Sequence, residues 1–202
     1  MDRRARDARA RPSGARLRRI PSRAGRRVRR RALRRALVRS ITSLSGRRTS
    51  VAARVDTLPP RITARKLASR YPDYITVDRK GFRLRHYRRL RLVKSYRIAI
   101  GQVGFDTPIG LYHLQNKAIN PAWNVPEKSW AGELAGSVIP SSSPDNPIKA
   151  RWMGIYDGAG IHGTEETGSL GSAASHGCIR MAVPEVKELY RRVEVGTPVY
   201  IA

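Results

Sequence analysis

The chain has 202 residues and a formal net charge of +26, a length that suits one domain of ordinary size plus a further segment. The charge is concentrated, because residues 1–50 contain 19 Arg against only Asp2 and Asp7. The single cysteine excludes an internal disulfide, and no apolar run reaches the roughly 18–20 residues of a membrane-spanning helix.

Residues 1–57 are predicted to form a disordered Arg-rich tail, with a transient helix over 28–39. The segment has few large aliphatic side chains and strong like-charge repulsion, so it buries too little apolar surface to offset the entropy of ordering. It is either a solvated tail or an arm for a polyanion: nucleic acid, anionic lipid or an acidic wall polymer. No hydrophobic core of a secretory signal is recognisable in it.

Residues 58–73 are predicted to form a linker that contains a short helix over 61–71. The hydrophobic period then changes to two, with alternating runs at 74–78, 82–87 and 90–101. This alternation predicts an antiparallel meander with one face exposed to solvent.

A loop and a strand are expected over 103–114. The following segment, 120–150, is long, irregular and rich in Pro, Asn, Ser and Gly. Such a segment inside a compact domain is usually functional or mobile. We interpret it as a flap over a site that presents Trp123 and Trp130; a surface loop anchored by the two aromatics is the alternative.

The last third of the chain predicts two short strands, a helix and a closing strand. The strands cover 151–156 and 159–163, and the helix covers 184–193, where apolar residues recur with helical spacing. Residues 197–202 close the chain as a strand. The whole sequence therefore predicts a mostly β fold with one good helix in its C-terminal half, preceded by the basic tail.

The only thiol, Cys178, lies in a stretch rich in small residues, two positions after His176 and sixteen after His162. A lone cysteine is most often a small core residue. An imidazole beside it would instead take the thiol proton, and Gly177 would let main-chain N–H groups approach a developing oxyanion. Spacing leaves open which histidine is the base. A fourth ligand for zinc is missing, so we expect no metal and no other cofactor.

The motif "HGT" at 162–164, followed by "SHGCIRM" at 175–181, closely resembles the L,D-transpeptidase catalytic domain of the YkuD type. The resemblance runs from about residue 75 to residue 201. Its other elements are "TPxG" at Thr107–Gly110, "NP" at Asn146–Pro147, "ARWMGI" at Ala150–Ile155 and the closing "VGTPVYI". It implies a sandwich-like, mostly β catalytic domain over 74–202.

The resemblance also implies a role for each residue of the motif. Cys178 would be the nucleophile, His162 the general base and the Gly163 carbonyl its orienting group. Amides around Gly177 and Cys178 would form the oxyanion hole, and Ser175 and His176 would shape the site. From the flap interpretation, and not from the resemblance, Trp123 and Trp130 are expected to contact the substrate. Arg180 would either meet a substrate carboxylate or order the motif.

The implied reaction is the cross-linking of peptidoglycan stem peptides outside the cytoplasm, in the cell wall or periplasm. A thioester would form on Cys178 with release of D-alanine, and an amine acceptor would then take the acyl group to give a 3–3 cross-link. The alternative, from another functional class, is a nucleic-acid or polyanion-binding protein that acts through its basic N-terminal arm.

Overall fold

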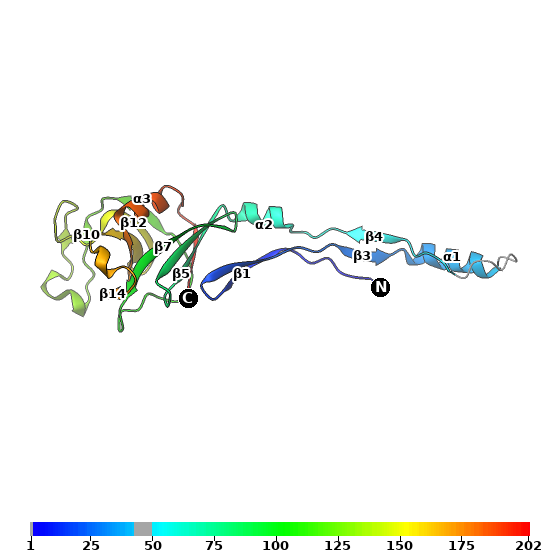
Figure 1. Ribbon diagram of the computed structural model, residues 1–202, viewed down its shortest axis with the longest axis horizontal. Coiled ribbons are helices and arrows are strands. Elements are labelled where there is room, and N and C mark those ends of the chain that lie inside the picture. The colour runs from blue at the N-terminus through cyan, green and yellow to red at the C-terminus, as the bar shows by residue number, and fades with distance from the viewer. Residues whose placement is uncertain (1, 43–49) are drawn as a thin grey trace. The chain divides into compact units, whose positions relative to one another are not determined.

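The computed structural model describes residues 2–42 and 50–202 (Figure 1). The chain divides into two units. The first comprises the described residues of 1–11 and 19–69, and the second comprises 12–18 and 70–202. Within the described residues, no helix is long and apolar enough to cross a membrane.

The first unit contains short strands and two helices. Its elements are part of the hairpin β1 (Arg9–Ser13) and β2 (Arg16–Ile20), then β3 (Gly25–Val28), α1 (Arg30–Thr42), β4 (Val55–Leu58) and α2 (Ala64–Arg70). Strands β3 and β4 pair antiparallel. The tip of the hairpin, residues 12–18, belongs to the second unit, where the Ala15 carbonyl accepts hydrogen bonds from Thr76 Oγ1 (2.8 Å) and Arg85 Nη1 (3.1 Å).

The strands of this unit lie in or at the edge of the segment 1–57 predicted as a disordered tail, whereas α1 overlaps the helix expected over 28–39 and α2 lies within the helix expected over 61–71. Main-chain pairing and a few carboxylates hold these strands, whereas the expectation of disorder rests on the small amount of apolar surface available for burial. Asp2 accepts from the Val28 N–H (2.8 Å), and Asp56 pairs with Arg29 (2.6 Å). Among the described residues of this unit, only Ala8 and Leu67 are buried apolar residues. The predicted boundaries at 57 and 73 stay predictions.

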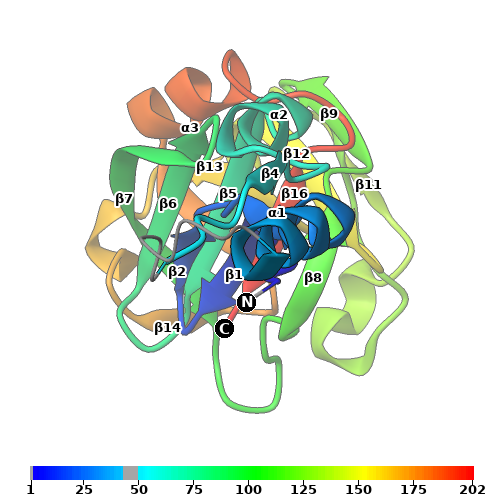
Figure 2. The same ribbon diagram turned by 90° about the vertical axis from the view of Figure 1, so that its right-hand side faces the viewer.

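A single curled sheet forms most of the second unit (Figure 2). Its strand order is β8-β16-β5-β6-β7-β15-β13-β12-β9, and β14 also pairs with β7. The strands are β5 (Asp73–Asp78), β6 (Arg83–Arg88), β7 (Arg91–Gly101), β8 (Gly110–His113), β9 (Asn116–Ile119), β12 (Lys149–Tyr156), β13 (Ala159–Thr164), β14 (Ala173–Ser175), β15 (Ile179–Ala182) and β16 (Pro198–Ile201). The expected mostly β fold, including the meander β5–β6–β7, is confirmed.

The hydrophobic core lies between the sheet and α3 (Val183–Tyr190), which packs against β12, β13 and β15. Pro184 suits the first turn of this helix, because its missing N–H would have no partner there. Val186 and Leu189 are fully buried beside Met153, Ile161 and other core side chains. The helix anchors the two strands that carry the candidate site.

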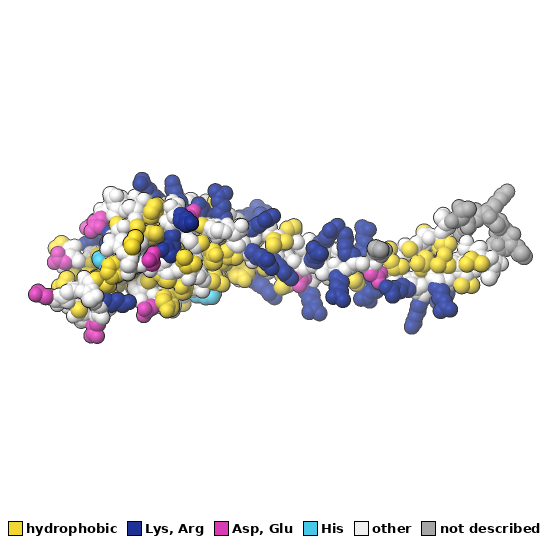
Figure 3. All heavy atoms as spheres, turned by 90° about the horizontal axis from the view of Figure 1, so that it is seen from below, with side chains coloured by type: hydrophobic (Ala, Val, Ile, Leu, Met, Phe, Trp, Pro, Cys, Tyr) yellow, Lys and Arg dark blue, Asp and Glu magenta, His cyan; other side chains and the backbone are white. Residues whose placement is uncertain are grey.

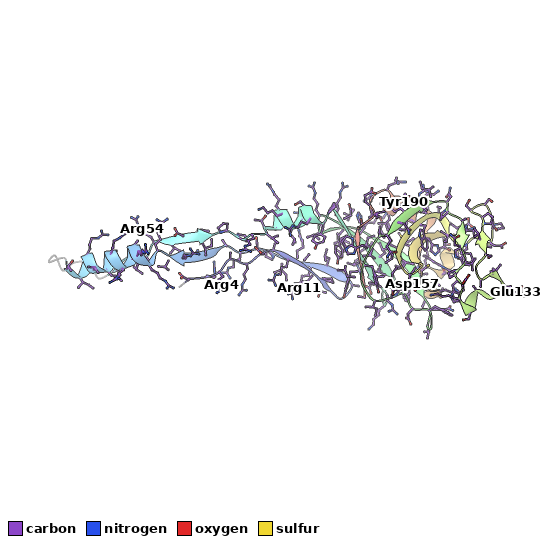
Figure 4. All side chains as sticks on the ribbon, turned by 180° about the vertical axis from the view of Figure 1, so that it is seen from behind. Arg4, Arg11, Arg54, Glu133, Asp157 and Tyr190 are labelled. Carbon is purple, nitrogen blue, oxygen red and sulfur yellow. The ribbon has the colours of Figure 1, made fainter. Side chains whose placement is uncertain are left out.

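The irregular segment 120–150 folds as a small hairpin with a 3₁₀ turn. It contains β10 (Trp123–Asn124), the turn η1 (Ser129–Leu134) and β11 (Val138–Ile139), with β10 and β11 antiparallel. The buried side chain of Asn146 ties its base together by donating to the Pro121 carbonyl (3.1 Å) and accepting from the Ile148 N–H (2.8 Å). Figure 4 labels Glu133, which lies on η1.

Candidate active site

Two neighbouring parallel strands carry the His–Cys pair singled out in the sequence. Strands β13 and β15 align Ile161 with Ile179 and His162 with Arg180, and Cys178 comes directly before β15. His162 and Cys178 both line one cavity of about 1240 Å³. The two residues are sixteen apart in sequence, and they come to the same cavity because β15 pairs with β13.

The imidazole of His162 is buried, with 4% of the residue exposed. Its Nδ1 lies 2.9 Å from the Gly163 carbonyl oxygen. Since a carbonyl can only accept, Nδ1 carries the proton and the Nε2 lone pair is left to act as a base. Burial lowers the pKa of His162 to about 4, more than the bond to Gly163 raises it, and the charge of Arg180 lowers it further. The ring is therefore neutral at neutral pH.

Cys178 is half-buried as a residue, and its Sγ lies 3.9 Å from the Gly158 carbonyl oxygen. Burial raises the pKa of this thiol, and this outweighs the lowering by a Gly160 main-chain hydrogen bond and by Arg180. With the cysteine pKa raised and the histidine pKa lowered, the resting pair is a thiol and a neutral imidazole. A neutral imidazole has the lone pair that a general base needs.

The turn that presents the thiol is fixed from two sides. The Ser175 hydroxyl donates to the Cys178 carbonyl (2.6 Å), and the Thr107 hydroxyl donates to the Gly177 carbonyl (3.0 Å) while accepting from the Gly101 N–H (2.9 Å). Gly177 has φ +106°, a conformation that side chains rarely adopt. Because both hydroxyl groups bind carbonyl oxygens of the turn, they fix the orientation of the main chain next to the sulfur.

Three aromatic rings meet at one side of the cavity. Trp130 stacks on His176 with ring centroids 4.3 Å apart and an angle of 12° between the planes. Phe105 packs edge-on against the same imidazole at 4.8 Å. His176 is therefore a contact between the turn and η1, and all three residues line the cavity.

Arg180 pairs with Glu166 at 2.6 Å, although Glu166 is largely exposed. The arginine side chain itself is mostly buried and also lines the cavity. It is the cationic group nearest in sequence to the thiol on the cavity wall. A negatively charged group entering the cavity would compete with Glu166 for the guanidinium.

The structure brings eight of the nine predicted site residues to this cavity: Trp123, Trp130, His162, Ser175, His176, Gly177, Cys178 and Arg180. Gly163 does not line it but accepts the His162 hydrogen bond. A side chain at 163 would collide with the Lys149 carbonyl oxygen on β12.

Sequence reasoning missed Thr107, Glu166 and the ring of Trp152, which stacks on His162 at 6.1 Å. The turn "TPxG" marked the position of Thr107 but not its bond to Gly177. Within residues 2–42 and 50–202, no group of three or more His, Cys, Asp or Glu is placed to hold a metal ion.

A family model for the L,D-transpeptidase catalytic domain matches residues 72–201. The chain is 36% identical over 131 residues to the putative L,D-transpeptidase YkuD of Bacillus licheniformis, covering 64% of this chain and 66% of that protein. It is 39% identical over 112 residues to the putative L,D-transpeptidase YqjB of Bacillus subtilis, covering 52% of this chain and 57% of the relative. The chain thus spans less than two thirds of the length of these relatives.

Among solved structures, the catalytic domain of an L,D-transpeptidase from E. faecium superimposes with a TM-score of 0.52 and 27% identity, covering 64% of this chain and 96% of that one. The same domain acylated by ertapenem also matches, with a TM-score of 0.52 and 27% identity over 65% of this chain and 98% of that one.

Proposed function

Because the chain belongs to the L,D-transpeptidase family, we propose that it cross-links peptidoglycan stem peptides through a thioester on Cys178. The observation that carries this proposal is the oriented, neutral imidazole of His162 in the same cavity as the only cysteine. A neutral base in the same cavity as a protonated thiol is suited to activate the nucleophile as it attacks.

In the first step, Nε2 of His162 takes the thiol proton while Sγ attacks the carbonyl carbon of the third stem residue. Amide N–H groups around Gly177 and Cys178 stabilise the oxyanion. The tetrahedral intermediate collapses by breaking the bond to the terminal D-alanine, whose amine takes the proton from the imidazolium. The products are a thioester on Cys178, free D-alanine and a neutral His162.

In the second step, the side-chain amine of another stem peptide enters the cavity. His162 removes a proton from this amine as the nitrogen attacks the thioester carbon. The carbon–sulfur bond breaks, the sulfur regains a proton from the imidazolium, and a 3–3 cross-link leaves the site. Water as the acceptor would give a hydrolysed tripeptide stem instead.

The cavity walls support a peptide substrate of this kind. Arg180 offers a cation on the wall that carries the thiol, which suits a stem carboxylate in the way that it pairs with the Glu166 carboxylate. Trp123 and Trp130 supply flat apolar surface on the hairpin side. Since peptidoglycan lies outside the cytoplasm, the proposal places the catalytic domain there.

Intact-mass analysis tests the assignment. The full chain is incubated with a tetrapeptide-stem muropeptide or with ertapenem, and the adduct is mapped by peptide sequencing. We expect one adduct on Cys178, none in Cys178→Ala, and slow formation in His162→Ala. Lys149→Gly is the control, because Lys149 does not line the cavity. Full acylation of Cys178→Ala, or equal rates in His162→Ala and Lys149→Gly, would refute the assigned roles.

A further inference from the structure

Helix α1 of the first unit exposes an apolar face. Leu33, Leu37 and Ile41 are spaced by four residues and therefore lie along one side of the helix, with Val38 next to them. The exposure rises along the helix, since Leu33 is half-buried, Leu37 is 43% exposed and Ile41 is 81% exposed. None of the residues of α1 is buried.

Unpaired cations surround this face. Arg31, Arg34, Arg35 and Arg39 form no ion pair with any residue in the described part of the chain. The whole segment 8–55 contains 17 Arg and no acidic residue. Figure 3 shows the hydrophobic side chains of α1 gathered together, with Lys and Arg side chains projecting beside them.

The start of the helix differs from the rest, because its arginines are already partnered. Arg30 pairs with Asp2 (3.0 Å) and Arg29 with Asp56 (2.6 Å). These pairs hold Arg30, the first residue of α1, to Asp2, and Arg29, which directly precedes the helix, to Asp56 on β4. The unpaired arginines and the exposed aliphatic side chains therefore belong to the later turns. Together they form a surface that is both cationic and apolar.

We propose that α1 binds the surface of a bilayer that contains anionic lipids, lying parallel to it. In such an arrangement aliphatic side chains enter the boundary between headgroups and acyl chains, while arginines reach the lipid phosphates. The guanidinium group suits a phosphate because it can donate two parallel hydrogen bonds. Charge complementarity selects anionic over neutral lipid, and further exposed arginines, such as Arg4 and Arg54 (Figure 4), add to the attraction.

The apolar face distinguishes this partner from a nucleic acid. Binding to a phosphate backbone depends on cations and released counterions, to which exposed Leu37, Val38 and Ile41 contribute nothing. A bilayer uses both the arginines and the aliphatic side chains. The two partners consequently respond differently when only the aliphatic side chains are changed.

The test measures co-sedimentation of the full chain with vesicles, at about 0.15 M salt. One set of vesicles is phosphatidylcholine alone, and the other contains about 30% phosphatidylglycerol. The variant Leu37→Gln/Ile41→Gln removes apolar surface without changing the charge. Because both side chains are exposed, the variant is expected to keep the fold of the first unit. The matched control is Leu92→Thr/Val93→Thr, two exposed aliphatic residues on β7. Binding to a fluorescent oligonucleotide is measured in parallel.

We expect the wild type and the β7 control to bind the anionic vesicles, and the α1 variant to bind them about tenfold or more weakly while its oligonucleotide binding is unchanged. Ertapenem acylation of the α1 variant at the wild-type rate shows that the second unit is intact. Equal vesicle binding by the α1 variant and the wild type would overturn the proposal. Binding to the oligonucleotide without binding to anionic vesicles would overturn it in favour of a nucleic acid.

Discussion

Replacing His162 with asparagine removes a buried titratable group and should therefore change how stability depends on pH. Asparagine keeps an N–H donor for the Gly163 carbonyl but cannot be protonated. In the wild type, burial lowers the pKa of the imidazole from 6.5 to about 4. A lowered pKa means that folding favours the neutral ring, so the stabilisation is complete above about pH 6.5 and is lost as the pH falls towards 4.

The size of the effect follows from this difference in pKa. A difference of one pKa unit corresponds to about 1.4 kcal/mol. On acidification the wild type should therefore lose about 3 kcal/mol of its free energy of unfolding through His162, and most of this loss should be complete by about pH 4.5. All other titratable groups are shared by the two proteins. Their contributions cancel when the pH dependence of the variant is subtracted from that of the wild type.

Urea unfolding followed by tryptophan fluorescence measures this difference at about pH 7.5 and pH 4.5. The signal reports on the second unit, because Trp123, Trp130 and Trp152 all lie there. The gap in stability between wild type and His162→Asn should narrow by about 2–3 kcal/mol on acidification. If the two proteins lose stability in parallel, the imidazole is not held neutral by burial, and its assignment as a neutral base fails with it.

Three further changes test the turn and its surroundings. Thr107→Val leaves the buried Gly101 N–H and Gly177 carbonyl without their partner, so it should lower the free energy of unfolding in urea by about 2–3 kcal/mol and slow the acylation of Cys178. Thr107→Ser should restore both. An unchanged unfolding midpoint in Thr107→Val would contradict the role given to these two hydrogen bonds. Gly177→Ala forces a side chain into a left-handed conformation and should cost about 1–2 kcal/mol and reduce the acylation rate, a result that wild-type kinetics would rule out. Trp130→Leu removes the ring stacked on His176 and should raise KM for a muropeptide more than it lowers kcat, while an effect on kcat alone would argue against a binding role.

The elements that sequence reasoning predicts well are those whose signal is local. Alternation around Leu84 predicts β6, because the side chains of a strand point to opposite faces, and the spacing of Val186 and Leu189 predicts α3. The motif around Cys178 likewise depends on a few neighbouring residues. These patterns show which side chains face the core, and the sheet and α3 are the elements that bury those side chains.

What could not be predicted depends on contacts between distant parts of the chain. Thr107 acts on Gly177, 70 residues away, and nothing in its neighbourhood indicates that bond. The pairing of Arg180 with Glu166 also requires β15 to return beside β13, at whose end Glu166 lies. The strands of the first unit escape prediction for another reason, since hydrogen bonds and carboxylates such as Asp2 hold them rather than apolar burial.

Strand β16 lies between β8 and β5, and within the described residues β8 has no other neighbour in the sheet. Residues 110–113 can therefore pair in the sheet only after residues 198–201 have been synthesised. Long-range pairing of this kind is slow, because a large loop closes before any contact is gained. Thr107 lies just before β8, and its hydroxyl steadies the thiol turn only once the Gly177 carbonyl, 70 residues further along the chain, has also folded into place.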